Sequence, residues 1–149
     1  MPEFVESVCV DAPIEQVWAA LADIGAISEW NPGVKESLQT TVGKVAKGAC
    51  RRCELGGKNY LDEEVVEFEA PFHITFRITD TNLPFKTADI RFSLNSEGTA
   101  TAVTVSPSNK LKFGAFGRVL DTLLVKGTYR KGMRDLLRGL KKHVETEAP

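Results

Sequence analysis

The segment 59–69 holds the side chains best suited to acid–base chemistry. Side chains alternate between the two faces of a strand, so Tyr60, Glu64 and Phe68 share one face here. If that face lines a cavity, Glu64 points inward beside Tyr60, and burial raises the pKa of its carboxyl group to suit a general acid or base. The alternative, which we favour, is that Glu64 pairs at the surface with Arg52 or another strand neighbour. The opposite face carries Leu61, Glu63, Val65 and Glu67.

Other sets of catalytic or metal-binding side chains are sparse. His73 and His143 are the only two histidines, and neither has a partner that suggests a triad or a metal site. Cys50 and Cys53 form a CxxC in "GACRRCEL", but residues three apart on a strand point to opposite faces. That geometry suits neither one zinc ion nor one disulfide. We therefore predict free thiols, no metal and no cofactor, with Arg130 as the candidate positive group beside a cavity.

The order of periodic segments predicts the elements that position these side chains. An alternating β-branched segment opens the chain, and two short helices follow, the second ending at the corner "EWNPG". Six more strands then run to residue 106, with connections short enough for one antiparallel meander. A helix over residues 118–147 closes the chain and spans on the order of 45 Å. Its glycines Gly127, Gly132 and Gly139 predict a close approach to another element or a bend over a curved sheet.

Composition and charge narrow the class of protein. A length of 149 residues, with 42% hydrophobic and 26% charged residues, fits one globular domain over residues 1–149. No apolar run approaches the roughly 18 residues of a membrane span, and no leader pattern is visible, so we expect a cytoplasmic protein. A net charge of −1 argues against nucleic acid. Residues 110–142 carry ten Lys and Arg against two Asp, which predicts a solvated basic helix or, as the alternative, an anion-binding or membrane-touching one.

Two long stretches resemble a known superfamily. The words "APIEQVWAALADIGAISEWNPGV" near the start and "FGAFGRVLDTLLVKGTYRKGMRDLLRGLKKHVE" near the end are similar to the corresponding stretches of SRPBCC proteins. That superfamily includes START-like lipid-transfer domains and polyketide cyclases/dehydratases. The resemblance implies a helix-grip fold of class α+β, in which a curved antiparallel sheet of about seven strands wraps around a long C-terminal helix, with two short helices after the first strand. It also implies that the corner at Trp30 seals the short helices against the sheet.

The same resemblance predicts an internal pocket between sheet and helix. One helical stripe cannot fill a curved sheet, so we expect an apolar cavity of at least a few hundred Å³. Phe113 and Phe116 are expected to form a gate, and Lys131 to lie near the cavity with Arg130. The remaining predicted wall residues are Ile74, Phe76, Ala88, Ile90, Phe92, Val103, Val105, Leu120, Leu123, Leu124 and Gly127.

Three functions are compatible with such a pocket. The first is binding, and possibly transport, of a small hydrophobic or amphipathic molecule by apolar burial, in a monomer or homodimer without stable membrane insertion. The second is a polyketide cyclase or dehydratase, in which Glu64, Tyr60 or Arg130 moves protons. The third is a lipid or quinone carrier that touches membranes through the basic helix. We rank the binding protein first, because no clear catalytic set is visible.

Overall fold

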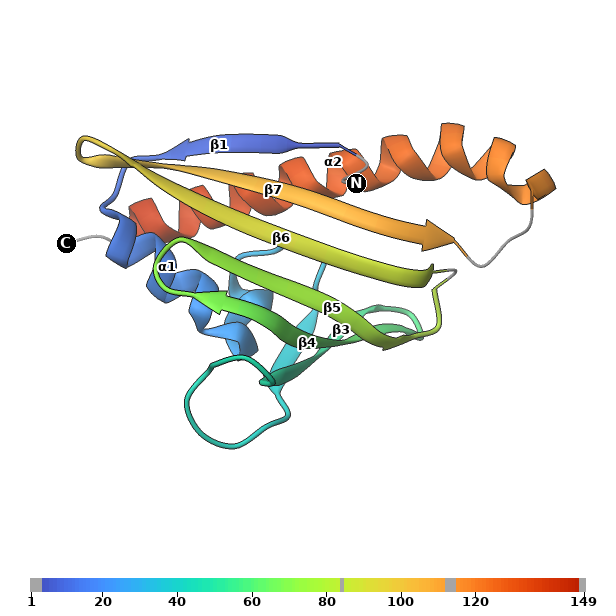
Figure 1. Ribbon diagram of the computed structural model, residues 1–149, viewed down its shortest axis with the longest axis horizontal. Helices are drawn as coiled ribbons and strands as arrows, with labels where there is room; N and C mark the ends of the chain where they lie inside the picture. The colour runs from blue at the N-terminus through green and yellow to red at the C-terminus, as the bar shows by residue number, and fades with distance from the viewer. Residues whose placement is uncertain (1–3, 84, 112–114, 148–149) are drawn as a thin grey trace.

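A seven-stranded antiparallel sheet forms the body of the protein. The computed structural model describes residues 4–83, 85–111 and 115–147, and its strand order is β1-β7-β6-β5-β4-β3-β2. The α+β helix-grip fold predicted from the sequence is confirmed, including the succession of one strand, two short helices, six strands and one long helix (Figure 1). The elements are β1 (Glu6–Val10), α1 (Ile14–Ala22), the 3₁₀ helix η1 (Ile24–Glu29), β2 (Glu36–Gln39), β3 (Cys50–Gly56), β4 (Asn59–Glu69), β5 (His73–Thr81), β6 (Phe85–Glu97), β7 (Ala100–Leu111) and α2 (Ala115–Glu147).

Tight turns connect the strands where the sequence places glycine. Gly56 and Gly57 join β3 to β4, and Gly98 joins β6 to β7, each with a positive φ that glycine adopts without strain. Strand β2 is shorter than its sequence pattern suggested, since only Glu36–Gln39 pairs with β3. The sheet therefore narrows to a short strand at one edge and ends on β1 at the other.

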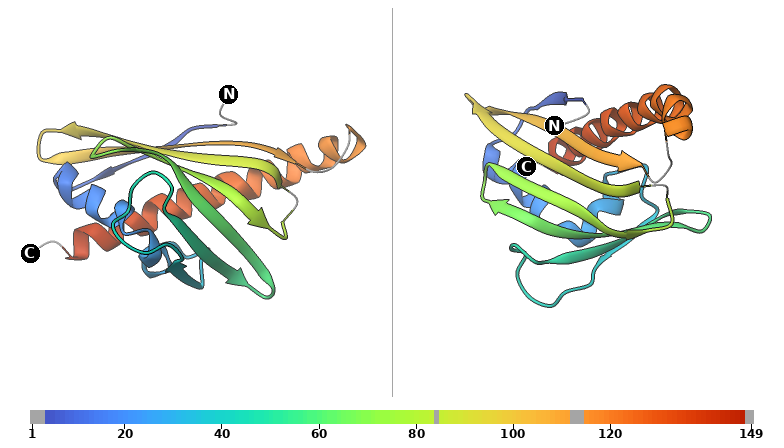
Figure 2. Two further views of the ribbon diagram at one scale, coloured as in Figure 1. Left: turned by 60° about the horizontal axis from the view of Figure 1, so that its bottom comes forward. Right: turned by 45° about the vertical axis from the view of Figure 1, so that its right-hand side comes forward.

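All three helices lie on the same side of the curved sheet (Figure 2). The second half of α2 buries Leu136, Leu137, Leu140 and Val144 in the core, together with residues of α1, η1 and the inner strand faces. Helix α2 also runs beside the edge strand β1, where Glu6 accepts hydrogen bonds from Arg130 at 3.2 Å and Arg134 at 2.6 Å. Among the described residues, no helix is long and apolar enough to cross a membrane.

The corner at Trp30 packs against α2 more closely than the sequence suggested. Trp30 is buried at the end of η1, and its backbone carbonyl lies against Gly139 of α2, where any side-chain atom would collide with it. Pro32 approaches the same glycine. The close approach predicted for a helix glycine is thus found at Gly139, whereas Gly132 has open space around its Cα. The tryptophan corner fixes η1 to the helix as well as closing the core.

Candidate ligand-binding site

A cavity of about 160 Å³ lies between the inner face of β3–β6, the η1–β2 corner and α2. Nine of its fifteen lining residues are apolar side chains, and Gly132 and Met133 bring α2 to its edge. The part of the cavity bounded by described residues is smaller than the few hundred Å³ that we predicted. Its walls are Ile27, Asn31, Gly33, Val34, Arg51, Cys53, Leu55, Leu61, Glu63, Phe76, Ile90, Phe92, Gly132, Met133 and Leu136.

The wall of this mostly apolar cavity contains an ion pair. Arg51 of β3 and Glu63 of β4 are direct cross-strand neighbours, and Arg51 Nε donates to Glu63 Oε1 at 2.9 Å. Their side chains are only 4% and 3% exposed. Arg51 Nη1 also donates to the carbonyl of Ile24 at 3.3 Å, and the guanidinium lies 3.9 Å from the centre of the Phe76 ring. Burial of a charged pair is costly unless it is hydrogen-bonded, and these contacts supply that compensation.

The thiol of Cys53 belongs to the same cluster. Its Sγ lies 3.7 Å from Glu63 Oε1 and donates a weak hydrogen bond to it. Burial raises the pKa of Cys53 to about 12, with Glu63 adding to the rise and Arg51 opposing it. The thiol is therefore neutral at physiological pH and acts as a donor to the carboxylate. It is not a nucleophile in this environment.

Two polar atoms of the pair remain available to a ligand. Within the described part of the chain, the hydrogen bonds of Glu63 all use Oε1, and those of Arg51 use Nε and Nη1. Glu63 Oε2 and Arg51 Nη2 thus have no protein partner there, although both residues line the cavity. The pair offers one acceptor and one donor side by side in an apolar surrounding. A hydroxyl or enol group of a bound molecule could use both.

Strand alternation and a bulge explain how these residues reach the interior. Arg51 and Cys53 alternate inward along β3, as do Leu61, Glu63 and Val65 along β4. The register of β4 against β5 shifts between Val65 and Glu67, which marks a β-bulge. The extra residue brings Phe68 back to the inner face, where its ring packs edge-to-face on Trp18. Phe68 therefore shares the inner face with Glu63, not with Glu64.

The candidate catalytic residues from the sequence lie elsewhere. Glu64 faces the other side of the sheet, paired in register with Cys50 of β3 and Arg77 of β5. The Tyr60 hydroxyl donates to Asp80 at 3.2 Å, and its ring lies under the Arg52 guanidinium at 3.9 Å. Arg130 pairs with Glu6 across β1. The structure does not bring these three side chains together.

Glu64 lies on the outer face, as in the alternative that we favour, but its cross-strand neighbours there are Cys50 and Arg77 and not Arg52. Arg52 lies directly opposite Asp62, and its guanidinium binds Asp62 at 3.1 Å and Glu54 at 3.0 Å. Glu64 is two residues further along β4, on the same outer face but opposite Cys50. The register of the β3–β4 hairpin, set by its turn, decides this pairing, and the sequence alone did not specify it.

The residues predicted in or near the cavity wall divide into four groups. Phe76, Ile90 and Phe92 line the cavity, whereas Ile74, Ala88, Val103 and Val105 are buried in the core around it. Lys131 is 76% exposed and pairs with Asp135, so it points away from the cavity. The last group lies outside the described residues or has side chains that the structure does not describe: Phe113, Phe116, Leu120, Leu123, Leu124 and Gly127.

Sequence reasoning missed Arg51, Cys53 and Glu63 as site residues. The signal that could have found them is the apolar pair Leu61 and Val65, which flanks Glu63 on the same strand face. An alternating strand normally turns its apolar residues inward, and these two place Glu63 inward as well. The aromatic ring of Phe68 pointed to the opposite choice only because the bulge was not visible in the sequence.

Comparison with known proteins agrees with this architecture. Residues 1–145 match the family described as "Polyketide cyclase / dehydrase and lipid transport", so the chain belongs to that family. Family and fold are consistent with binding a hydrophobic ligand or with a cyclase-like activity. No curated protein matches the chain closely enough to serve as a relative.

Solved structures show the same fold at low sequence identity. A crystal structure from Thermus thermophilus has a TM-score of 0.83 and 20% identity, and the match covers 99% of this chain and 100% of that one. A START superfamily protein from Mycobacterium smegmatis has a TM-score of 0.76 and 18% identity, covering 97% and 98%. The Zhui aromatase/cyclase from Streptomyces has a TM-score of 0.79 and 13% identity, covering 95% and 92%. At identities this low, the structural similarity shows the fold alone and leaves the identity of the ligand open.

Proposed function

We propose that this protein binds a small hydrophobic or amphipathic molecule in the cavity between sheet and helix. The observation that carries the proposal is the composition of the cavity wall, which is mostly apolar and holds one buried, hydrogen-bonded cluster around Arg51 and Glu63, with Asn31 as the other polar side chain. Apolar burial supplies the affinity, at roughly 25 cal/mol per Å². The free donor and acceptor of the pair fix the orientation of a polar group on the ligand.

The cavity sets the size of the molecule that its described walls accept. A volume of about 160 Å³ is close to that of an engineered apolar cavity of about 150 Å³ that binds benzene. A single ring therefore fills the space beside Arg51 and Glu63.

The test compares two single-ring probes that differ in one polar group. Toluene measures apolar filling alone, and phenol adds a hydroxyl that can use Glu63 Oε2 and Arg51 Nη2. We expect both to bind in ligand-observed NMR, with phenol tighter by a few-fold, since one net hydrogen bond contributes about 0.5–1.5 kcal/mol. If neither probe binds, the result counts against the cavity as a ligand site.

A matched pair of helix variants tests where the probes bind. Gly132 lines the cavity, and a Cβ added there meets nothing within 4 Å, so Gly132→Leu starts a side chain at the cavity edge. Leucine also favours the helix over glycine, and thermal unfolding of the variant checks that lost binding is not unfolding. Lys131→Leu changes the neighbouring, exposed residue and is the control. We expect Gly132→Leu to abolish probe binding and Lys131→Leu to retain it.

A cyclase or dehydratase activity is the second candidate, and the position of Glu63 favours it. The carboxylate lines the cavity with one oxygen free, as a group that moves a proton on a bound polyketone must. Glu63→Gln keeps the size of the side chain and an oxygen acceptor for Arg51 but removes the titrating group. In an enzyme this change abolishes turnover and retains ligand affinity. In a binding protein it leaves only a small change in affinity.

We also propose a cytoplasmic location for this protein, and its free thiols support it. Cys9, Cys50 and Cys53 are all free, and Cys9 is exposed. Free exposed thiols persist where glutathione and thioredoxin keep cysteines reduced. Localisation of a tagged full-length chain by microscopy or fractionation tests this placement.

A further inference from the structure

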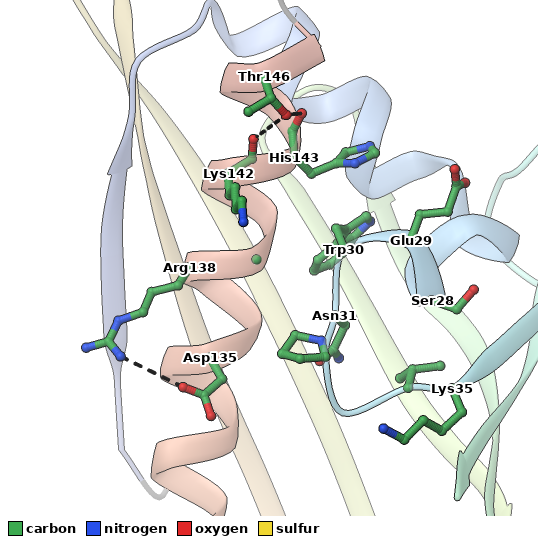
Figure 3. A pocket seen from close by; sticks show the side chains of 13 residues that line it. Ser28, Glu29, Trp30, Asn31, Lys35, Asp135, Arg138, Lys142, His143 and Thr146 are labelled. Carbon is green, nitrogen blue, oxygen red and sulfur yellow. Dashed lines mark hydrogen bonds and ion pairs between the residues drawn. The ribbon is translucent and has the colours of Figure 1, made fainter.

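A second concave site lies outside the internal cavity, between the η1–β2 corner and the C-terminal half of α2 (Figure 3). This groove, which we call the corner groove, has a volume of about 670 Å³. Its lining residues are Ser28, Glu29, Trp30, Asn31, Pro32, Val34, Lys35, Asp135, Arg138, Gly139, Lys142, His143 and Thr146.

The corner groove exists because two elements meet at a glycine. The backbone of Trp30 rests against Gly139, so the corner touches the helix there. Lys142, one turn further along α2, and Lys35, at the end of the corner, project on the two sides of this contact (Figure 3). Two cations from segments more than a hundred residues apart in the chain therefore line the same groove.

Hydrogen-bond donors without partners gather in the corner groove. Trp30 is only 6% exposed, and its Nε1 is the one buried side-chain polar atom of the described residues that has no hydrogen-bond partner. Asn31 uses its Oδ1 to accept from the backbone N–H of Gly33 at 2.9 Å, which leaves its amide NH₂ as a donor. Within the described part of the chain, neither Lys35 nor Lys142 forms an ion pair through its ammonium group.

The acceptors of the corner groove are largely engaged. Asp135 binds Lys131 at 2.9 Å and lies 3.9 Å from Arg138. The Thr146 hydroxyl donates to the backbone carbonyls of Lys142 and His143, at 2.7 Å and 3.2 Å. Glu29 lies at the rim and is the remaining carboxylate. Donors and positive charge thus exceed acceptors and negative charge, and a buried unpaired donor is costly.

We propose that the corner groove binds a phosphate group, either free or as part of a lipid headgroup. A phosphate supplies several acceptor oxygens and a negative charge, which are what Trp30 Nε1, the Asn31 amide and the two lysines lack. Apolar surface from Pro32 and Val34 can contact the rest of a phosphate-bearing molecule. This site shares Asn31 and Val34 with the Arg51–Glu63 cavity but opens on the other side of the corner, and its occupancy does not depend on the function proposed for that cavity.

The two tryptophans make a direct measurement possible. In ¹H–¹⁵N spectra the indole N–H of Trp30 reports on the corner groove, and that of Trp18, which packs on Phe68 in the core, serves as an internal reference. Titration with inorganic phosphate is expected to move the Trp30 resonance in a saturable way and to leave that of Trp18 in place. Sodium chloride at equal ionic strength is the control. An equal shift with chloride, or no shift of Trp30 with phosphate, overturns the proposal unless the lipid arm below succeeds.

Lysine variants connect the signal to the groove. Lys142→Ala and Lys35→Ala are each expected to weaken phosphate binding about tenfold, the usual effect of losing one charge-assisted hydrogen bond. Lys58→Ala, at the exposed β3–β4 turn, is the matched control and is expected to change affinity less than about twofold, since a distant exposed charge is screened. Equal weakening by all three variants would mean non-specific charge attraction and would overturn the site.

A vesicle experiment distinguishes the two sources of the phosphate. Vesicles of phosphatidylcholine with phosphatidic acid are compared with phosphatidylcholine alone by co-sedimentation of the full chain. Binding that needs phosphatidic acid, and is lost in Lys142→Ala and Lys35→Ala but kept in Lys58→Ala, supports a lipid headgroup as the ligand. A phosphate response without vesicle binding supports a free phosphate compound. Neither response, or vesicle binding that is unchanged in the lysine variants, rules the corner groove out as a phosphate site.

Discussion

The two faces of the sheet use the same residue types with different consequences. On β3 and β4, Arg51 and Glu63 form an ion pair on the inner face, and their immediate neighbours Arg52 and Asp62 form another on the outer face. The N–O distances are 2.9 Å and 3.1 Å, but the side chains are 4% and 3% exposed on the inner face against 35% and 32% on the outer one. Geometry is nearly constant between the two pairs, and burial is what differs.

This comparison shows that ion pairs of one hairpin are not equivalent in energy. Water screens the outer pairs, so each contributes about 0–1 kcal/mol. The inner pair adds little to the free energy of unfolding, because removing two charges from water is costly. Breaking the pair is nevertheless destabilising, because it leaves one buried charge without compensation. Outer-face pairs keep the surface soluble and favour one strand register, while the inner pair can orient a bound ligand. The predictions below test how burial changes the effect of similar groups.

The largest contrast is expected in the reactivity of the cysteines. Burial raises the pKa of Cys53 to about 12, so about one thiol in ten thousand is ionised at pH 8, against roughly a quarter of ordinary thiols. Exposed Cys9 should therefore react with iodoacetamide at least about tenfold faster than Cys53 in the folded protein, even though a thiolate of higher pKa is the better nucleophile, because Cys53 is also buried. A mass-spectrometric time course of each cysteine-containing peptide measures this ratio. Similar rates without denaturant would show that the inner wall is open to water.

The next largest effect is expected from removing one member of the inner pair. Glu63→Leu leaves Arg51 buried without its carboxylate and should lower the free energy of unfolding by about 3–5 kcal/mol. Chemical denaturation measures this change. Glu64→Leu, one residue away on the outer face, is the matched control and should change the free energy of unfolding by less than about 1 kcal/mol, as most surface substitutions do.

The double variant Arg51→Met/Glu63→Leu tests whether the ion pair stabilises the fold or only offsets the cost of burying its own two charges. With both charges gone, no buried charge remains unpaired, and stability should recover most of what Glu63→Leu lost. Phenol should then bind no better than toluene, because the polar anchor is absent. A double variant as unstable as the single one would mean that the pair itself holds the strands together.

The elements of the fold were predictable because each has a local signal. Alternation indicates the strands, glycines mark the β3–β4 and β6–β7 turns, and the spacing of Leu137, Leu140 and Val144 indicates the buried side of α2. What failed was register. The bulge at Val65–Glu67 places Phe68 on the same face of the sheet as Glu63. The β3–β4 turn sets the register so that Arg52 lies opposite Asp62 instead of Glu64.

The candidate site depended on those two details and could not be derived without them. Glu63 was assigned to the face opposite Phe68, so it was passed over as a cavity residue. Arg51 carried no periodic signal, since a buried arginine in a strand looks like an exposed one in the sequence. Both residues are placed by pairing across strands, and cross-strand pairing is set by tertiary structure. The apolar walls, by contrast, needed only hydrophobic alternation.

Two helix glycines give a contrast of intermediate size. Gly139 meets the Trp30 carbonyl, so Gly139→Ala forces the corner and the helix apart and should lower the free energy of unfolding by about 1–3 kcal/mol. Gly132 meets nothing, so Gly132→Ala should raise it by about 0.5–1 kcal/mol through helix propensity. Thermal unfolding of both variants checks the opposite signs. Stabilisation by Gly139→Ala would mean that the corner does not rest on α2.

The smallest effect is expected from an outer-face pair, and it should depend on pH. Glu67 accepts hydrogen bonds from Arg91 at 2.9 Å and from Thr75 at 2.6 Å, and these contacts, Arg91 first, lower the pKa of its carboxyl group. A lowered folded-state pKa means stability that is present above the unfolded value of about 4.3 and is lost as pH falls through the folded value. The two side chains are 46% and 36% exposed, so the contribution at pH 7 is only about 0.2–1 kcal/mol. Denaturation of the wild type and Glu67→Gln should therefore differ by that amount at pH 7 and converge below about pH 4. A difference that grows in acid would mean that the folded-state pKa of Glu67 is not lowered. A difference of several kcal/mol at pH 7 would show that water does not screen the outer face and would remove the contrast with Arg51 and Glu63.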